Sequence, residues 1–169
     1  MKKVIVIGCP GSGKSTFSKK LNEITNIPLY HLDLMYWNND KTIVEKEVFL
    51  NKIVETLKKD SWIIDGNYRS TMELRMKEAD TIFFLDMPTK LCLESERLRR
   101  GKPREDLPSY LIEEGEDEEF VNLITNFQDN QRHLIVEILD KHKDKNIVTF
   151  KSREEVENYL LKLASENVS

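Results

Sequence analysis

Residues 8–15 read Gly-Cys-Pro-Gly-Ser-Gly-Lys-Ser and directly follow the apolar run Val4–Ile7. This order fits the spacing Gly-x4-Gly-Lys-[Ser/Thr], in which a strand, a glycine-rich turn and a helix succeed one another. Glycines let successive backbone N–H groups converge on an anion at the N-terminus of the helix. Apolar residues at helical spacing follow the turn, at Phe17, Leu21 and Ile24. The segment therefore predicts a phosphate-binding loop (P-loop) at the start of an α/β fold.

The chemistry of such a loop assigns roles to its members. Lys14 is expected to reach the β- and γ-phosphates of ATP, and the Ser15 hydroxyl is expected to coordinate Mg²⁺. ATP and Mg²⁺ are thus the predicted cofactors. The residues expected to contact the nucleotide are Gly8, Pro10, Gly11, Ser12, Gly13, Lys14, Ser15 and Thr16.

The composition is that of a globular domain. The chain has 169 residues, 39% of them hydrophobic and 33% charged, and its 26 basic and 30 acidic side chains give a net charge of −4. This length suffices for one core, so we expect a single domain over residues 1–169. The negative charge argues against direct DNA binding and against attraction to a membrane surface. Two cysteines without metal-site or disulfide spacing favour a cytoplasmic location, and no apolar run approaches a membrane span.

Short apolar runs alternate with longer amphipathic stretches, which is typical of a parallel sheet covered by helices on both faces, that is, three layers. We expect five strands, at residues 3–7, 28–32, 62–64, 81–85 and 146–150.

Helix positions are indicated by capping patterns and periodicity. Ser/Thr-x-x-Glu patterns that favour helix starts lie at residues 42–45, 70–73 and 152–155. The longest helical period covers residues 119–141, and the last helix is expected over residues 153–164.

Acidic side chains follow two of the expected strands, where a parallel sheet binds its ligands. Asp65 comes directly after Trp62-Ile63-Ile64, the pattern of a Walker B carboxylate that holds a Mg²⁺-bound water. The alternative is a turn formed by Asp65, Gly66 and Asn67 without chemistry. Asp33 follows the second strand and is the candidate general base that contacts the acceptor.

Half of the arginines of the chain lie in the segment 97–104. Guanidinium groups bind phosphate in a bidentate manner, so Arg97, Arg100 and Arg104 are candidate catalytic residues. Gly101 and Pro103 make the segment a candidate lid over ATP, at about residues 99–118. The alternative is a solvated basic helix end.

Three further side chains are candidate contacts to the acceptor. His31 and Trp37 follow the second strand, and Trp37 has a ring that can stack on a planar group. Arg132 projects from the long helix and can bind phosphate. The alternatives are packed residues for the first two and a surface residue for the third.

Several of these segments together resemble the bacterial DNA topology modulation protein family, a branch of the adenylate-kinase-like P-loop proteins. The resemblance rests on the P-loop, on Tyr-His-Leu-Asp after the second strand, on Ile-Ile-Asp-Gly-Asn-Tyr-Arg at 63–69, on Phe-Leu-Asp-x-Pro, and on Pro-Arg-Glu-Asp. It implies a sheet order of 2-3-1-4-5 and a short lid. It also implies that Arg69 binds phosphate in an Asp-Gly-x-x-Arg segment, with Asp65, Gly66 and Asn67 beside the substrate.

One segment departs from the nucleoside monophosphate kinases. Those enzymes carry Thr-Gly-Asp-x-x-Arg after the second strand, whereas Leu34-Met35-Tyr36-Trp37 follows Asp33 here. Because the P-loop, the two carboxylates and the arginine-rich segment are all expected at one edge of the sheet, the sequence predicts a kinase that transfers the ATP γ-phosphoryl group to a nucleotide or another small-molecule acceptor. The alternative is a nucleotide-sensing regulator that binds ATP without productive transfer.

Overall fold

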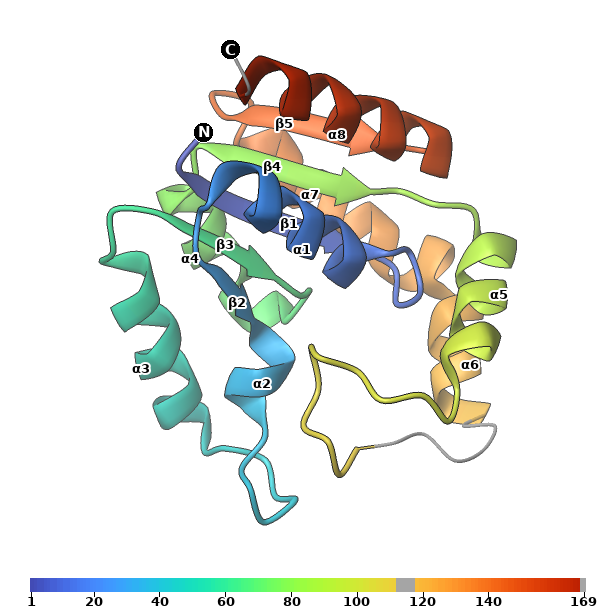
Figure 1. Ribbon diagram of the computed structural model, residues 1–169. Helices are drawn as coiled ribbons and strands as arrows, with labels where there is room; N and C mark the ends of the chain where they lie inside the picture. Colours follow the sequence, from blue (N-terminus) through green and yellow to red (C-terminus); the bar gives the residue numbers. More distant parts are fainter. Residues whose placement is uncertain (112–117, 168–169) are drawn as a thin grey trace.

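The computed structural model describes residues 1–111 and 118–167, and its centre is one parallel sheet (Figure 1). The strand order is β2-β3-β1-β4-β5, which confirms the expected order. All neighbouring strands run parallel, with Val4 of β1 opposite Ile63 of β3 and Thr81 of β4. The strands are β1 (Lys3–Gly8), β2 (Leu29–His31), β3 (Trp62–Asp65), β4 (Thr81–Leu85) and β5 (Asn146–Phe150).

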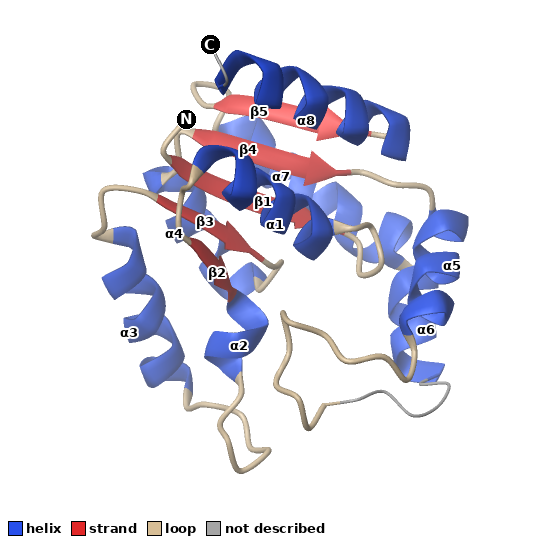
Figure 2. Cartoon of the chain, viewed as in Figure 1, coloured by secondary structure: helices blue, strands red, loops and turns tan. Residues whose placement is uncertain are grey.

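Helices cover both faces of the sheet, as expected for three layers (Figure 2). In this view α1 and α8 lie in front of the sheet, with α4 and α7 behind it. Helices α5 and α6 pack together beyond the ends of the strands. The helices are α1 (Lys14–Thr25), α2 (Leu32–Tyr36), α3 (Lys46–Leu57), α4 (Arg69–Glu78), α5 (Thr89–Arg99), α6 (Glu118–Thr125), α7 (His133–Lys141) and α8 (Arg153–Asn167).

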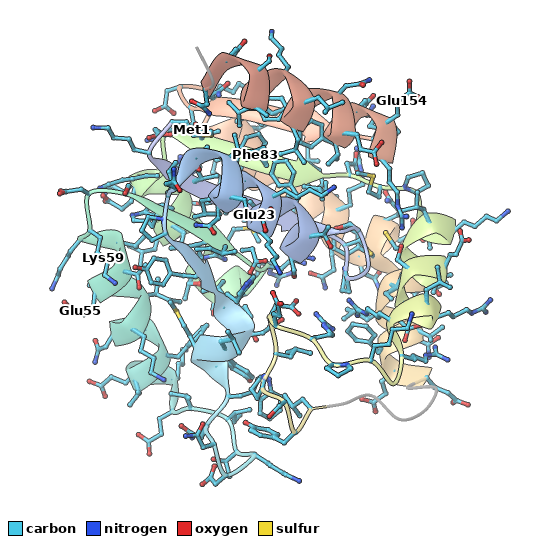
Figure 3. The ribbon with its side chains drawn as sticks, in the orientation of Figure 1. Met1, Glu23, Glu55, Lys59, Phe83 and Glu154 are labelled. Atoms are coloured by element: carbon cyan, nitrogen blue, oxygen red, sulfur yellow. The ribbon has the colours of Figure 1, made fainter. Side chains whose placement is uncertain are left out.

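The core explains why these strands are so apolar. Strands β1, β3 and β4 are buried on both faces, so their residues form continuous runs of Val, Ile and Phe rather than an alternation. An aromatic cluster fills the space between the sheet and α1 and α8. Phe83, which is labelled in Figure 3, is stacked with Phe150 at a centroid distance of 5.9 Å, and Phe17 meets it edge-on at 4.8 Å. This core fixes the carboxyl ends of the strands, where the candidate site lies.

Two of the expected helix starts are wrong. Thr42 does not cap α3, which begins at Lys46, because its hydroxyl bonds instead to Asp40 in a preceding turn. Ser70 lies inside α4, which starts one residue earlier after Tyr68. The third start is confirmed: Ser152 Oγ accepts the Glu155 N–H at 3.2 Å, and the Glu155 carboxylate accepts the Lys151 N–H.

The single helix expected over residues 119–141 is divided. Helix α6 ends at Thr125, and a π-helical turn over Gln128–Arg132 precedes α7. A π turn takes in more residues than an α turn, so it shifts the helix face that follows it. The shift allows Ile124, Phe127 and Ile135 all to be buried. The apolar residues on both sides of this break can be read as one 3.6-residue period, so the sequence predicts a single helix.

The second strand is also shorter than expected, because Leu32 begins α2 rather than ending β2. The expected lid over residues 99–118 lies partly outside the described residues. Its described part, residues 100–111, follows α5 without regular secondary structure and is called the lid segment below. Figure 1 shows it in yellow, running from the end of α5 towards α2.

Candidate active site

The carboxyl ends of the strands open into a cavity of about 1150 Å³. Its lining combines the loop after β1, the ends of β2 and β3, and the lid segment. The cavity thereby joins the predicted nucleotide loop to the predicted acceptor residues His31, Asp33 and Trp37. This is the position at which parallel α/β sheets bind ligands.

The glycines of the P-loop are required by close packing. A Cβ atom at Gly11 would lie 2.3 Å from the Cys92 carbonyl oxygen on α5, and one at Gly8 would lie 2.5 Å from the Leu85 carbonyl oxygen. Both residues also have positive φ angles, of 79° and 152°. Any side chain at these positions would push the loop away from β4 and α5. Gly13, with φ at 97°, caps the N-terminus of α1 and has open space where a Cβ would stand.

The Lys14 side chain folds back onto the P-loop. Its Nζ donates to the carbonyl oxygens of Gly8 and Cys9, both at 3.0 Å. Burial lowers the pKa of Lys14, and the negative charge of Asp65 opposes this. The ammonium group is thus held at the floor of the cavity, where it can reach the phosphates of a nucleotide seated on the loop.

Asn67 fastens the P-loop to the end of β3. Its Oδ1 accepts the Gly8 N–H at 3.1 Å, and its Nδ2 donates to the Gly8 carbonyl oxygen at 2.8 Å. Predicted as a substrate contact, Asn67 lines the cavity together with Gly66 and positions the start of the loop. Pro10, Ser12, Ser15 and Thr16 also line the cavity, as the P-loop motif predicts.

Asp65 ends β3 and is 5% exposed. Its Oδ1 is 2.9 Å from Nδ1 of His31, whereas its Oδ2 is buried with no hydrogen-bond partner in the protein. Burial disfavours the charged imidazole, but the hydrogen bond and charge of Asp65 outweigh it, so the pKa of His31 is raised. A buried, unpartnered carboxylate oxygen beside a P-loop fits a Mg²⁺-bound water.

Asp33 lies on α2 opposite the P-loop. The hydroxyl of Tyr68 donates to Asp33 Oδ1 at 2.6 Å. Burial raises the pKa of Asp33, while the Tyr68 hydrogen bond and the charge of Lys14 oppose the rise. Tyr68 has a φ of 27°, in a region that a bulky residue rarely adopts. Strained residues of this kind concentrate at functional sites.

The lid segment reaches the P-loop through Asp106, which the sequence analysis did not single out. Ser15 Oγ donates to Asp106 Oδ2 at 2.5 Å, and Arg104 forms a two-pronged pair with the same carboxylate at 2.9 and 2.6 Å. Burial opposes ionisation, but the Arg104 and Ser15 contacts lower the pKa of Asp106 to about 2. Near its far end, the Tyr110 hydroxyl donates to the Asn38 carbonyl oxygen beyond α2. The lid segment thus spans the cavity.

The structure separates the predicted arginines. Arg104 lines the cavity, but Arg97 is exposed on α5 and Arg100 pairs with Glu96 at 2.7 Å, and neither lines it. Arg69, the first residue of α4, is exposed and also lies outside the lining. Arg132 pairs with Asp86 at 2.7 Å, again outside the lining. Phosphate binding by Arg69, Arg97, Arg100 and Arg132 remains a prediction from the sequence.

Arg75 was not among the site residues predicted from the sequence, but it holds the conformation of the loop between β3 and α4. It is fully buried in α4 and donates to the carbonyl oxygens of Gly66 at 3.0 Å, Asn67 at 2.5 Å and Tyr68 at 3.3 Å. Burial lowers its pKa. Its place six residues after Arg69 on the same helix, about 1.7 turns further along, gives no sign in the sequence that it is buried. It holds the loop that carries Asn67 and Tyr68.

The donor set limits what kind of metal site is present. Among residues 1–111 and 118–167, no three His, Cys, Asp or Glu side chains form a metal-binding group. Mg²⁺ in phosphotransferases is held by one or two side-chain oxygens, by water and by substrate phosphates, so Ser15 and Asp65 fit this ion.

In the part of the chain that the structure describes, no helix has the length and apolarity needed to cross a membrane.

Comparison with known proteins gives similarity in structure only. No protein-family model and no curated protein sequence matches the chain. A shikimate kinase from Acinetobacter baumannii, in complex with shikimate, has a TM-score of 0.62 and 14% identity over 100% of this chain and 96% of its own. A shikimate kinase from Bacteroides thetaiotaomicron has a TM-score of 0.55 and 17% identity over 98% of each chain. The chain therefore has the P-loop kinase fold that these shikimate kinases share.

Proposed function

We propose that the chain is a Mg²⁺-dependent phosphotransferase that transfers the γ-phosphoryl group of ATP to a hydroxyl of a small acceptor. The observation that carries this proposal is the single cavity that joins Lys14 of the P-loop to Asp33 of α2. The kinase fold of the structural neighbours supports the proposal as analogy.

The roles follow from position and charge. ATP with Mg²⁺ supplies the phosphoryl group and the cation that offsets its charge. Lys14 and the N–H groups at the start of α1 bind the phosphates, while Ser15 and Asp65 face the metal ion. Arg104 can add a guanidinium from the lid segment.

Asp33 is the proposed general base. It takes the proton of the acceptor hydroxyl, whose oxygen bonds to the γ-phosphorus as the bond from that phosphorus to ADP breaks. The raised pKa of Asp33 makes the carboxylate a better proton acceptor. Tyr68 orients it through the hydrogen bond to Oδ1.

Membership of the DNA topology modulation family remains a prediction from the sequence.

A phosphoryl-transfer screen tests the proposal. Purified protein with Mg²⁺ and γ-labelled ATP is offered nucleosides, nucleotides, sugars, cyclic polyols and shikimate, and labelled products are separated from inorganic phosphate. We expect at least one acceptor to be labelled faster than water, with loss of about 10³-fold or more in Lys14→Met and Asp33→Asn. Lys58→Met, which removes an exposed lysine paired with Glu55, is the matched control. Tight ATP binding with no labelled acceptor would favour the regulatory function.

A further inference from the structure

We propose that the acceptor carries no phosphate or carboxylate group and is an uncharged or cationic hydroxyl compound. This inference rests on the proposed function, because it takes the wall around Asp33 as the place where the acceptor binds. The acceptor wall is defined here as the side chains from the ends of β2 and β3, from α2 and from the loop before α4 that line the cavity: His31, Asp33, Trp37, Asp65, Asn67 and Tyr68.

The acceptor wall is acidic. It contains two carboxylates: Asp65, which lies 2.9 Å from Nδ1 of His31 and faces the proposed Mg²⁺, and Asp33, which among the described residues is hydrogen-bonded to the uncharged Tyr68 hydroxyl and to no cation. Asp106 of the lid segment is a third carboxylate near His31 and Asp33, and its charge is paired with Arg104 at 2.6 Å. An anionic group placed here would meet like charges in a partly desolvated cavity, where their repulsion is poorly screened.

Arginines that could offset this charge are directed elsewhere. Arg75 donates to the backbone carbonyl oxygens of Gly66, Asn67 and Tyr68 and is fully buried beneath the loop. Arg69 is exposed at the start of α4, outside the cavity lining. The two arginines nearest in sequence to the acceptor wall therefore present no guanidinium to the cavity.

The lysines and arginines that line the cavity come from elements other than the acceptor wall. They come from the P-loop, α1, the end of α5, the lid segment and the start of α8: Lys14, Lys19, Lys20, Arg99, Arg104 and Arg153. This separation of charge suits a nucleotide triphosphate on one side and an acceptor without negative charge on the other.

The acceptor wall offers positive reasons for binding such a compound. Its carboxylates are strong hydrogen-bond acceptors for hydroxyl or ammonium donors. Trp37 supplies a half-buried aromatic surface, braced edge-on by Tyr36 at a centroid distance of 5.7 Å. Tyr36 in turn packs on Tyr68 at 5.0 Å. An aromatic face beside carboxylates suits a polyhydroxylated ring, a nucleoside or an amino alcohol.

Matched sets of compounds test the charge rule directly. Glucose, glucosamine and glucuronate share one ring, adenosine and thymidine pair with their 5′-monophosphates, and inositol pairs with quinate. Binding is measured calorimetrically to the protein loaded with Mg²⁺ and a non-hydrolysable ATP analogue, and transfer is measured with ATP. In at least one set we expect the uncharged or cationic member to bind at least tenfold tighter than its anionic match. A preference for the anionic member, or no discrimination in any set, would overturn the inference.

A pair of charge-adding variants tests the location of the effect. Trp37→Arg places a guanidinium on the acceptor wall, so we expect the discrimination against anionic members to shrink by about tenfold or more. Leu34→Arg adds the same charge three residues earlier, on α2, at a position 42% exposed and outside the lining, and should leave the discrimination unchanged. Equal effects of both variants would also overturn the inference.

The outcomes separate this inference from the proposed function. Selective binding of uncharged members without phosphoryl transfer contradicts the function and leaves the charge rule standing. Efficient transfer to an anionic acceptor confirms the function and contradicts the charge rule.

Discussion

The Tyr68 hydroxyl donates a hydrogen bond to Asp33 Oδ1 at 2.6 Å and so links the loop before α4 to helix α2. The hydrogen bond stabilises the ionised form of Asp33 against the effect of burial. Tyr68 adopts a φ of 27° in doing so. A strained tyrosine that supports a carboxylate is the arrangement expected where a proton acceptor must be held in one orientation.

Replacement of Tyr68 by Phe should therefore shift the acidic limb of the pH profile. Without the hydrogen bond the pKa of Asp33 rises further above its usual value, so more of the base is protonated at a given low pH. Hydrogen bonds to charged groups contribute about 1.5–3 kcal/mol, so kcat/KM on the acidic limb should fall by about tenfold or more. The loss should lessen as pH rises and Asp33 ionises in both proteins.

Tyr30→Phe is the matched control for this variant. Tyr30 lies on the edge strand β2, and its hydroxyl accepts a hydrogen bond from Lys59 at 2.9 Å away from Asp33. Its profile should match that of the unaltered protein. The groups that face Asp33 besides Tyr68 are Lys14, Asp65 and Asp106, and all of them remain in both variants. An unchanged acidic limb in Tyr68→Phe would exclude Asp33 as the titrating base.

Replacement of Asp106 by Asn should loosen the lid segment. The change removes the charged acceptor of the Arg104 pair and of the Ser15 hydroxyl, contacts worth about 1.5–3 kcal/mol. Opening of the segment should become at least tenfold more frequent, and a broad-specificity protease should cleave it correspondingly faster.

The neighbouring Glu105→Gln serves as its control, because that side chain is 78% exposed and pairs with Lys19, which is itself 53% exposed. It should be cleaved at nearly the unaltered rate. If both variants are cleaved alike, the Asp106 contacts do not hold the lid segment.

Cys9 and Cys92 should react slowly with a thiol reagent in the native protein. Both are buried, at 2% and 0% exposure, and the hydrogen bond between them raises the pKa of Cys9 and lowers that of Cys92. Burial keeps the reagent away from both sulfur atoms, so either thiol should react slowly whatever its ionisation. Titration with a disulfide reagent should give a rate at least about 100-fold below that of the same protein in denaturant, which exposes both thiols. Rapid native labelling of either one would contradict this.

Much of the architecture was predictable because it depends on local patterns. Continuous β-branched runs mark strands that are buried on both faces, and the bounds of β4 and β5 were predicted without error. The P-loop was equally readable, since its chemistry lies within consecutive residues. Asp33 and Asp65 could be chosen because the ends of parallel strands meet at one edge.

What could not be predicted depends on contacts between distant positions. Ser15 and Asp106 are 91 residues apart, and their hydrogen bond requires the lid segment to cross the cavity, which no periodicity encodes. The four arginines in residues 97–104 led us to predict several phosphate-binding side chains. Helix geometry and local ion pairs decide which of these arginines line the cavity. The buried role of Arg75 was missed because an arginine in a helix is ordinarily a surface residue.

Replacement of Arg75 by Met should damage both stability and the acceptor side of the site. The change removes the Arg75 donors from the part-buried carbonyl oxygens of Gly66 and Asn67 and one donor from that of Tyr68, which keeps Thr71, so the free energy of unfolding should fall by about 3 kcal/mol or more. Released from Arg75, Tyr68 should relax from its strained conformation and cease to orient Asp33.

Denaturant unfolding and steady-state kinetics measure the two effects. Arg75→Lys keeps the charge but not the forked geometry, so it should fold better than Arg75→Met and still lose kcat, with little change in the KM for ATP. Arg69→Met, an exposed change at the start of the same helix, should leave the free energy of unfolding within about 0.5 kcal/mol of that of the unaltered protein. Full kcat in a folded Arg75→Lys would show that the loop keeps its conformation without the forked contacts, with Tyr68 held by its hydrogen bonds to Thr71 at 3.0 Å and to Asp33 at 2.6 Å.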